Sequence, residues 1–142
     1  MKIKTIRSAP LSGPRKFGNP DTPKAARFTS NATDNPERSD SYWPPWGQVI
    51  CIATAEDGTW GLGMTSHAGP VPSIINDHFA PLLEGQSCFA TEKLWDVMFK
   101  ASTHYGTQGL ASHAISAVDL ALWDLKGKLL NKPVYELLGG PA

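Results

Sequence analysis

The chain changes its hydrophobic period once, between residues 66 and 71, and this change constrains the fold more than any other feature. Apolar and polar residues alternate over residues 2–7, and residues 48–66 are typical of two strands joined at Asp57-Gly58. From Val71 onward the apolar residues recur at helical spacing. Strands followed by helices predict an α+β fold, in which a helical bundle follows a three-stranded antiparallel sheet.

The predicted hairpin carries three further expectations. Residues 48–55 have apolar or small side chains on both faces, which predicts a strand covered on both sides. The Asp57-Gly58 pair predicts a two-residue turn, because both residue types tolerate a positive φ. Gly61 and Gly63 in the return strand indicate a close backbone approach or a bulge.

Two helices are predicted before residue 110. The first covers residues 71–83, and Pro81 should bend or end it. Thr91 should cap the second, which turns one apolar face inward. The residues of that face are Leu94, Trp95, Met98 and Phe99.

The strongest helical pattern covers residues 112–130. Asp124 and Lys128 form a favourable i, i+4 pair on it, and Asn131 with Pro133 should end it. Its apolar stripe consists of Ile115, Val118, Leu122, Leu125 and Leu129.

Residues 8–47 show no periodicity and hold seven of the twelve prolines. A loop of this length inside a compact domain is functional or disordered. Bulky aromatic side chains, which a plain linker lacks, favour a lid that orders over a ligand, with a disordered linker as the alternative. These side chains are Phe17, Phe28, Tyr42, Trp43 and Trp46. The lid-like loop is expected over residues 9–46.

Composition excludes several classes of protein. Thirteen basic and thirteen acidic residues give a formal net charge of zero, and the basic ones near the N-terminus are spread among prolines, so nucleic acid is not an expected partner. No apolar run is long enough for a membrane helix or a secretory signal. Cys51 and Cys88 are too few for a disulfide scaffold, so a reduced, cytoplasmic protein is expected.

No catalytic or metal-binding motif is found. Ser66 and His67 are chain neighbours, an arrangement not expected to bring the hydroxyl against the imidazole. Asp119 and Asp124 are five residues apart, so they fall on different faces of one helix. The four histidines lack metal-ligand spacing, and packing or surface roles are expected for them. They are His67, His78, His104 and His113.

Residues 114–140 closely resemble a signature of the mandelate racemase/muconate lactonizing branch of the enolase superfamily. The match runs through Ala114, Ser116, Val118, Asp119, Ala121, Asp124, Gly127, Lys128, Pro133, Val134, Leu137, Leu138 and Gly139. The resemblance implies that residues 1–142 form an α+β capping domain. A TIM barrel, expected after residue 142, would then carry the catalytic residues and the carboxylates that bind Mg²⁺.

The resemblance also implies where substrate specificity lies. Within the family, the loop after the first strand and the loop after the hairpin contact the substrate, and here they correspond to residues 9–46 and 65–70. The chain looks most like the L-rhamnonate dehydratase-like sugar-acid dehydratases. Arg38 stands in the place of a substrate-binding arginine, and its planar fork suits a carboxylate or polyol oxygens. Trp43 and Trp46 could wall the pocket or pin the loop to the sheet. His67 could replace a first-loop histidine that this chain lacks.

The implied activity is removal of the proton α to a carboxylate, with Mg²⁺ stabilising the enediolate, and loss of the β-hydroxyl. The implied partners are a small anionic sugar acid, the chain's own barrel and further copies of the chain. A racemase, epimerase or lactonizing enzyme of the same branch is one alternative. A stand-alone binding module without enzymatic activity is the other.

Overall fold

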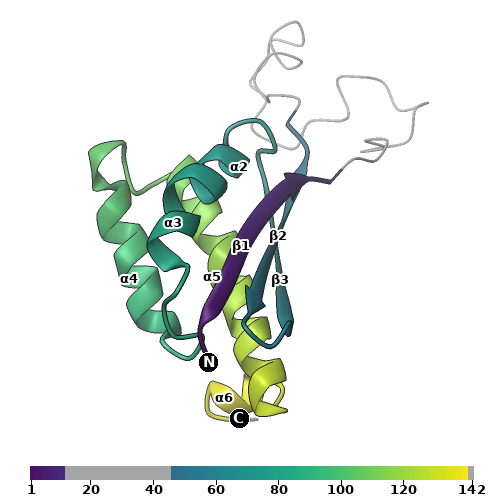
Figure 1. Ribbon diagram of the computed structural model, residues 1–142. Coiled ribbons are helices and arrows are strands. Elements are labelled where there is room, and N and C mark those ends of the chain that lie inside the picture. Colours follow the sequence, from purple (N-terminus) through teal and green to yellow (C-terminus); the bar gives the residue numbers. More distant parts are fainter. Residues whose placement is uncertain (12–45, 141–142) are drawn as a thin grey trace, which may run out of the picture.

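The computed structural model describes residues 1–11 and 46–140, and its strands precede its helices (Figure 1). The elements are β1 Ile3–Pro10, β2 Gln48–Ala55, β3 Trp60–Ser66, α2 Val71–Ser73, a π-helical segment Ile74–Phe79, α3 Ala80–Leu83, α4 Thr91–Ala101, a 3₁₀ turn Ser102–His104, α5 Leu110–Leu130 and α6 Val134–Leu137. The sheet is antiparallel in the order β1-β2-β3. The predicted α+β class, with a three-stranded sheet and a helical bundle, is confirmed.

Helix α5 lies directly on β3, and glycines make this possible. A Cβ on Gly61 would overlap the carbonyl oxygen of Ala121, and a Cβ on Gly63 would overlap that of Ala117. Two strand residues rise about 6.6 Å and four helix residues about 6.0 Å, so strand and helix stay in step along the contact. The expected close backbone approach is therefore confirmed, and the pairing of β2 with β3 continues without a bulge.

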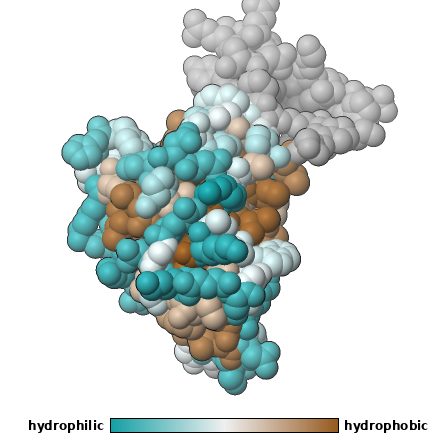
Figure 2. Space-filling model, viewed as in Figure 1, coloured by the Kyte–Doolittle hydropathy of each residue, from teal (hydrophilic) through white to brown (hydrophobic). Residues whose placement is uncertain are grey.

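One face of the sheet packs on α5. Among residues 1–11 and 46–140, no helix covers the other face, contrary to the expectation that residues 48–55 are covered on both sides. The inward side chains of β2 are fully buried, whereas the outward side chains of Ile50 and Ile52 are only partly buried. Beside them on β3, Trp60, Leu62 and Met64 are 50%, 40% and 42% exposed. Figure 2 shows apolar residues gathered at the surface on this side of the molecule. The sheet thus presents an apolar outer face.

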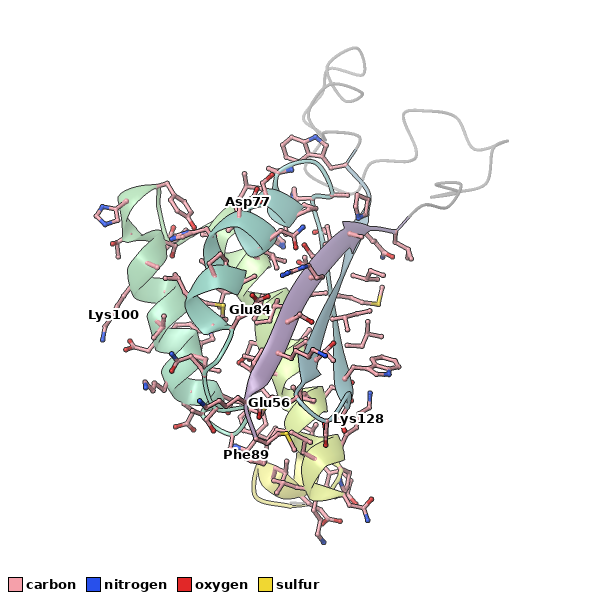
Figure 3. All side chains as sticks on the ribbon, in the orientation of Figure 1. Glu56, Asp77, Glu84, Phe89, Lys100 and Lys128 are labelled. Carbon is pink, nitrogen blue, oxygen red and sulfur yellow. The ribbon has the colours of Figure 1, made fainter. Side chains whose placement is uncertain are left out.

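Both edges of the sheet are tied down by polar side chains (Figure 3). On β1, Glu84 accepts hydrogen bonds from the Ile6 backbone at 3.0 Å and from Arg7 at 2.6 Å. On β3, the Asp124 carboxylate accepts from the Leu62 N–H at 2.8 Å and from Lys128 at 2.7 Å. An unpaired edge is a template for further strands, so these bonds limit sheet extension.

The two hydrogen bonds of Asp124 predict a measurable effect on stability. Asp124→Ala should lower the free energy of unfolding by about 1 kcal/mol more than Asp96→Ala, because Asp124 holds a backbone N–H of β3 as well as a lysine. Asp96 is the matched control, since within the described residues it pairs with Lys100 alone, on an exposed helix face, and undergoes the same gain in helix propensity. Urea unfolding followed by circular dichroism measures both. Equal losses would show that the hydrogen bond to the Leu62 N–H adds nothing.

Pro81 does not end the helical run, which continues from Val71 to Leu83. The preceding turn widens, so that the Ala80 N–H bonds to the Ile75 carbonyl five residues back. Pro81 then stands in the first turn of α3, where its missing N–H is tolerated. A π-helical segment thus absorbs the proline.

Thr91 does not cap α4, because Ala90 occupies the N-cap and Thr91 is the first helical residue. Among residues 1–11 and 46–140, the buried Thr91 hydroxyl finds no hydrogen-bond partner. The prediction that four apolar residues of α4 face inward is confirmed for two of them only. Leu94 and Met98 are buried, but Trp95 and Phe99 stack on each other at the surface, with ring centroids 5.1 Å apart.

Several element ends differ from the expectation. Strand β1 continues through Pro10, so the loop predicted from residue 9 begins later; a proline is tolerated there because β1 is an edge strand. Helix α5 begins at Leu110 rather than at residue 112. In the hairpin turn only Gly58 has a positive φ, of 88°, and Asp57 does not. Asn131 ends α5 in the left-handed conformation, as predicted.

Candidate functional site

The candidate site lies at the end of the sheet where β1 ends, β2 begins and β3 ends (Figure 1). The Leu11 N–H bonds to the Gln48 carbonyl at 2.8 Å, and the Ala68 N–H bonds to the Gly47 carbonyl at 3.0 Å. The topology therefore brings the segment after β3, residues 65–70, to the point where β1 and β2 leave the sheet. This is the end to which both predicted specificity loops belong.

His67 follows β3 with a strained backbone. Its φ is 71°, a left-handed value that few residues other than glycine adopt. The Ser66 hydroxyl lies 3.0 Å from Nδ1 of His67. The backbone carbonyl of His67 accepts a hydrogen bond of 3.1 Å from the N–H of Val71, at the start of α2. The side chain is half-buried. Both its backbone and one ring nitrogen are thus held in place.

The contact between Ser66 and His67 corrects an expectation, since the chain neighbours were not expected to bring hydroxyl and imidazole together. The left-handed backbone of His67 turns its ring back toward Ser66. Within the described part of the chain, no carboxylate pairs with His67 to complete a nucleophilic triad. The pair therefore fixes the ring and does not resemble a hydrolase site.

His113, in the first turns of α5, stands against His67 with ring centroids 4.3 Å apart. Its Nδ1 lies 3.2 Å from the Thr65 hydroxyl. Burial lowers the pKa of His113, and the neighbouring His67 lowers it further. The two imidazoles therefore resist carrying positive charge at the same time.

Sequence reasoning assigned His113 to packing or to the surface and missed this contact. A signal was present in the register of β3 against α5. Gly61 faces Ala121 and Gly63 faces Ala117. One further step of two strand residues and four helix residues places Thr65 opposite His113.

Trp46 completes the cluster. Its indole meets the His67 ring edge-on, with centroids 5.7 Å apart. Gly69 passes so close that a Cβ there would lie 2.8 Å from the indole Nε1. His67 is therefore enclosed by Trp46, His113 and Ser66. The other two predicted site residues, Arg38 and Trp43, lie outside the described residues, so their substrate-binding roles stay predictions.

The described acids do not form a metal site. In residues 1–11 and 46–140, no three His, Cys, Asp or Glu side chains lie close enough to hold an ion. The Asp124 carboxylate already accepts hydrogen bonds from the Leu62 N–H and from Lys128 at the sheet edge. Asp119 is half-buried on α5, and burial raises the pKa of its carboxyl. These residues do not fit a Mg²⁺ site, which needs converging oxygens.

Neither cysteine is a candidate nucleophile. Cys51 and Cys88 are both free and buried in the core. Burial raises the pKa of the Cys51 thiol to about 12, so the reactive thiolate is suppressed.

No helix in the described part of the chain is long and apolar enough to cross a membrane.

Residues 47–139 match the family model for the N-terminal domain of mandelate racemase/muconate lactonizing enzymes. The chain therefore belongs to this family, as its N-terminal domain. The matched segment begins at the candidate site and extends through α5 and α6.

Among individual proteins, the chain is similar to L-rhamnonate dehydratase from Saccharopolyspora erythraea, with 50% identity over 96 residues. The alignment covers 68% of this chain and 25% of that protein, so the chain spans about a quarter of the curated relative. A putative L-rhamnonate dehydratase from Caldivirga maquilingensis is 46% identical over 96 residues, which cover 68% of this chain and 24% of that protein.

Solved structures agree with these relatives. Rhamnonate dehydratase from Gibberella zeae, complexed with Mg, superposes with a TM-score of 0.83 at 34% identity over 98% of this chain and 37% of that one. A 3,6-anhydro-D-galactonate cycloisomerase from Zobellia galactanivorans gives a TM-score of 0.63 at 45% identity over 66% of this chain and 27% of that one. The N-terminal, enolase-like capping fold is thereby confirmed.

Proposed function

We propose that this chain is the N-terminal capping domain of a Mg²⁺-dependent dehydratase that acts on L-rhamnonate or a similar sugar acid. The observation that carries the proposal is the 50% identity to an L-rhamnonate dehydratase over 96 residues. The chain covers a minor part of every relative named above, which supports a longer protein with a barrel domain.

In this proposal the barrel holds Mg²⁺ and removes the proton α to the carboxylate, after which the β-hydroxyl leaves as water. The capping domain binds and orients the acid and excludes water from the site. His67 contacts the substrate from the segment after β3, and Arg38 and Trp43 contact it from the loop between β1 and β2. The two buried free thiols suit a reducing compartment, which supports a cytoplasmic location.

The test is an assay of the full-length protein with Mg²⁺ against a panel of aldonic acids that includes L-rhamnonate. We expect loss of water from at least one of them, with formation of the 2-keto-3-deoxy acid. Dehydration of no panel member would overturn the proposal.

A racemase, epimerase or lactonizing enzyme is the second candidate. The likeness to a cycloisomerase from Zobellia galactanivorans, at 45% identity, favours it more than any other observation. The same assay separates the two candidates. Inversion at the α-carbon or ring closure, with no loss of water, would favour the second candidate.

The apolar surface predicts how the isolated chain behaves. Trp60, Leu62 and Met64 are exposed on the outer sheet face, and the Trp95–Phe99 pair is exposed on α4. Exposed apolar patches of this kind mark interaction sites. We propose that the barrel or further copies of the protein cover parts of it.

The 142-residue chain alone should therefore self-associate at micromolar concentration. Sedimentation velocity over a concentration series measures the self-association. The full-length protein is the control and should keep one defined oligomeric state. A monodisperse monomer of the isolated chain across the concentration series would contradict the prediction.

A further inference from the structure

Helix α4 turns two large aromatic side chains outward. Trp95 and Phe99 are one turn apart and 41% and 37% exposed, and their rings stack with centroids 5.1 Å apart and planes inclined by 11°. The other side of the helix carries Leu94 and Met98, which pack into the core. Aromatic side chains are enriched at the centres of protein interfaces, because they bury a large apolar area. The Trp95–Phe99 pair therefore marks a contact surface.

This surface lies away from the candidate site. Helix α4 packs against α5 and α3, and Figure 1 shows it on the side of the domain opposite the sheet. The candidate site lies at the ends of the strands, and in the proposed function this is where the barrel meets the capping domain. The barrel thus leaves the outer face of α4 to another partner.

One acid and one base lie beside the aromatic pair. Asp96 and Lys100 form an ion pair of 2.6 Å, and at least half of each side chain is exposed. With 3.6 residues in each turn, both fall on the same flank of the Trp95–Phe99 pair, one turn apart. Figure 3 shows Lys100 pointing away from the domain. A partner that covers the aromatic rings must therefore also meet these two charges.

The order of these residues is self-complementary when two copies of α4 run antiparallel. A two-fold axis that passes beside residues 97–98 places Trp95 of one copy near Phe99 of the other. The same axis places Asp96 of one copy near Lys100 of the other. Opposite charges and apolar rings are thus matched at the same time, as they are in paired interface helices.

The remaining acid on this face does not oppose the pairing. Glu92 lies in the first turn of α4, and the same axis places it near Thr103 of the other copy. The Thr103 hydroxyl carries no charge, so no two like charges meet. In a parallel pair each residue would lie level with its own counterpart, and Glu92 would meet Glu92. The charges therefore favour the antiparallel orientation.

We propose that the outer face of α4 is a self-association surface, on which a second copy of this protein packs through antiparallel α4 helices. Four aromatic rings, two from each copy, form the centre of the contact. Two Asp96–Lys100 pairs across the axis set the register, since packed helices lie about 8–10 Å apart and side chains of this length span that gap. The pairing goes beyond the proposed function, and its test needs no substrate.

The test reverses one charge at a time in the full-length protein and measures its mass by sedimentation velocity. Asp96→Lys gives each copy two lysines beside the rings, and Lys100→Asp gives each copy two aspartates. Each variant alone should form a smaller assembly than the wild type, with the dissociation constant raised at least about tenfold, because like charges then face each other.

Mixing the two variants in equal amounts should restore the wild-type assembly. The lysines of one copy then face the aspartates of the other. The ion pair within each α4 stays broken in the mixture, so its repair cannot explain the recovery. Recovery on mixing is therefore expected only if α4 pairs with α4.

Two further variants complete the test. Asp77→Lys makes the same change of charge at an exposed position outside α4, so it should keep the wild-type assembly. Trp95→Gln removes one of the central rings and should raise the dissociation constant at least about thirtyfold. Circular dichroism checks that each variant keeps the fold.

A monomeric wild-type protein, or single variants that keep the wild-type assembly, would overturn the pairing. Loss of assembly without recovery on mixing would overturn it as well, because α4 would then contact the barrel or a different surface of the neighbouring copy. If the mixture recovers but no sugar acid is dehydrated, the proposed function fails and the pairing of the helices stands.

Discussion

Gly63→Ala should strongly destabilise this domain. The new Cβ would overlap the Ala117 carbonyl oxygen and lie 2.9 Å from the Ala121 nitrogen, both of which belong to the rigid backbone of α5. Because neither atom can rotate away, β3 and α5 must separate. We expect a loss of at least about 3 kcal/mol in the free energy of unfolding, a large part of the stability of a small domain.

Gly58→Ala is the matched control for this prediction. Gly58 has nothing within 4 Å of its Cβ position, so alanine there pays only for the left-handed φ of 88°. That cost is about 1 kcal/mol. Urea unfolding of both variants at low protein concentration measures the difference. A loss at position 63 no greater than that at position 58 would show that β3 and α5 are not in direct contact.

Arg38→Ala should produce the largest kinetic effect of any change in the loop between β1 and β2. In the proposed site the guanidinium donates two parallel hydrogen bonds to carboxylate or hydroxyl oxygens of the sugar acid. Loss of a charged, partly desolvated contact costs about 2–3 kcal/mol, so kcat/KM for the sugar acid should fall about a hundredfold. The thermal midpoint should hardly change, because we assign Arg38 to the substrate and not to the core.

Two further variants make the Arg38 prediction specific. Arg38→Lys keeps the charge but loses the planar fork, so it should recover only part of the activity. Arg27→Ala removes a charge from the same loop without a predicted contact, and its kinetics should match the wild type. Equal kinetics of Arg38→Ala and the wild type would remove Arg38 from the site.

Local patterns in the sequence predicted most of the fold. The alternation of polar and apolar residues predicted the strands, and Gly61 and Gly63 predicted a close backbone approach at β3. Asn131 predicted the end of α5. The errors arose where tertiary contacts override local preference. Ala90 takes the N-cap that Thr91 was expected to fill, and Trp95 and Phe99 stack at the surface instead of facing inward. These outcomes depend on how neighbouring turns pack, which no single-residue propensity contains.

The candidate site was harder to predict than the fold. His67 was found because it lies in a segment that the family resemblance identifies. His113 lies 46 residues further along the chain, and only the register of β3 against α5 brings it to His67. The open outer face of the sheet was also missed, because Ile50 and Ile52 look the same in sequence whether this chain or another domain covers them.

The central claim is that this chain binds the substrate while the reacting groups belong to a barrel domain. The most direct measurement compares the isolated 142-residue chain with the full-length protein, both with Mg²⁺ and the same sugar acid. The account predicts loss of water with the full-length protein and none with the isolated chain. Turnover by the isolated chain would contradict it, because the catalytic groups would then lie within these residues.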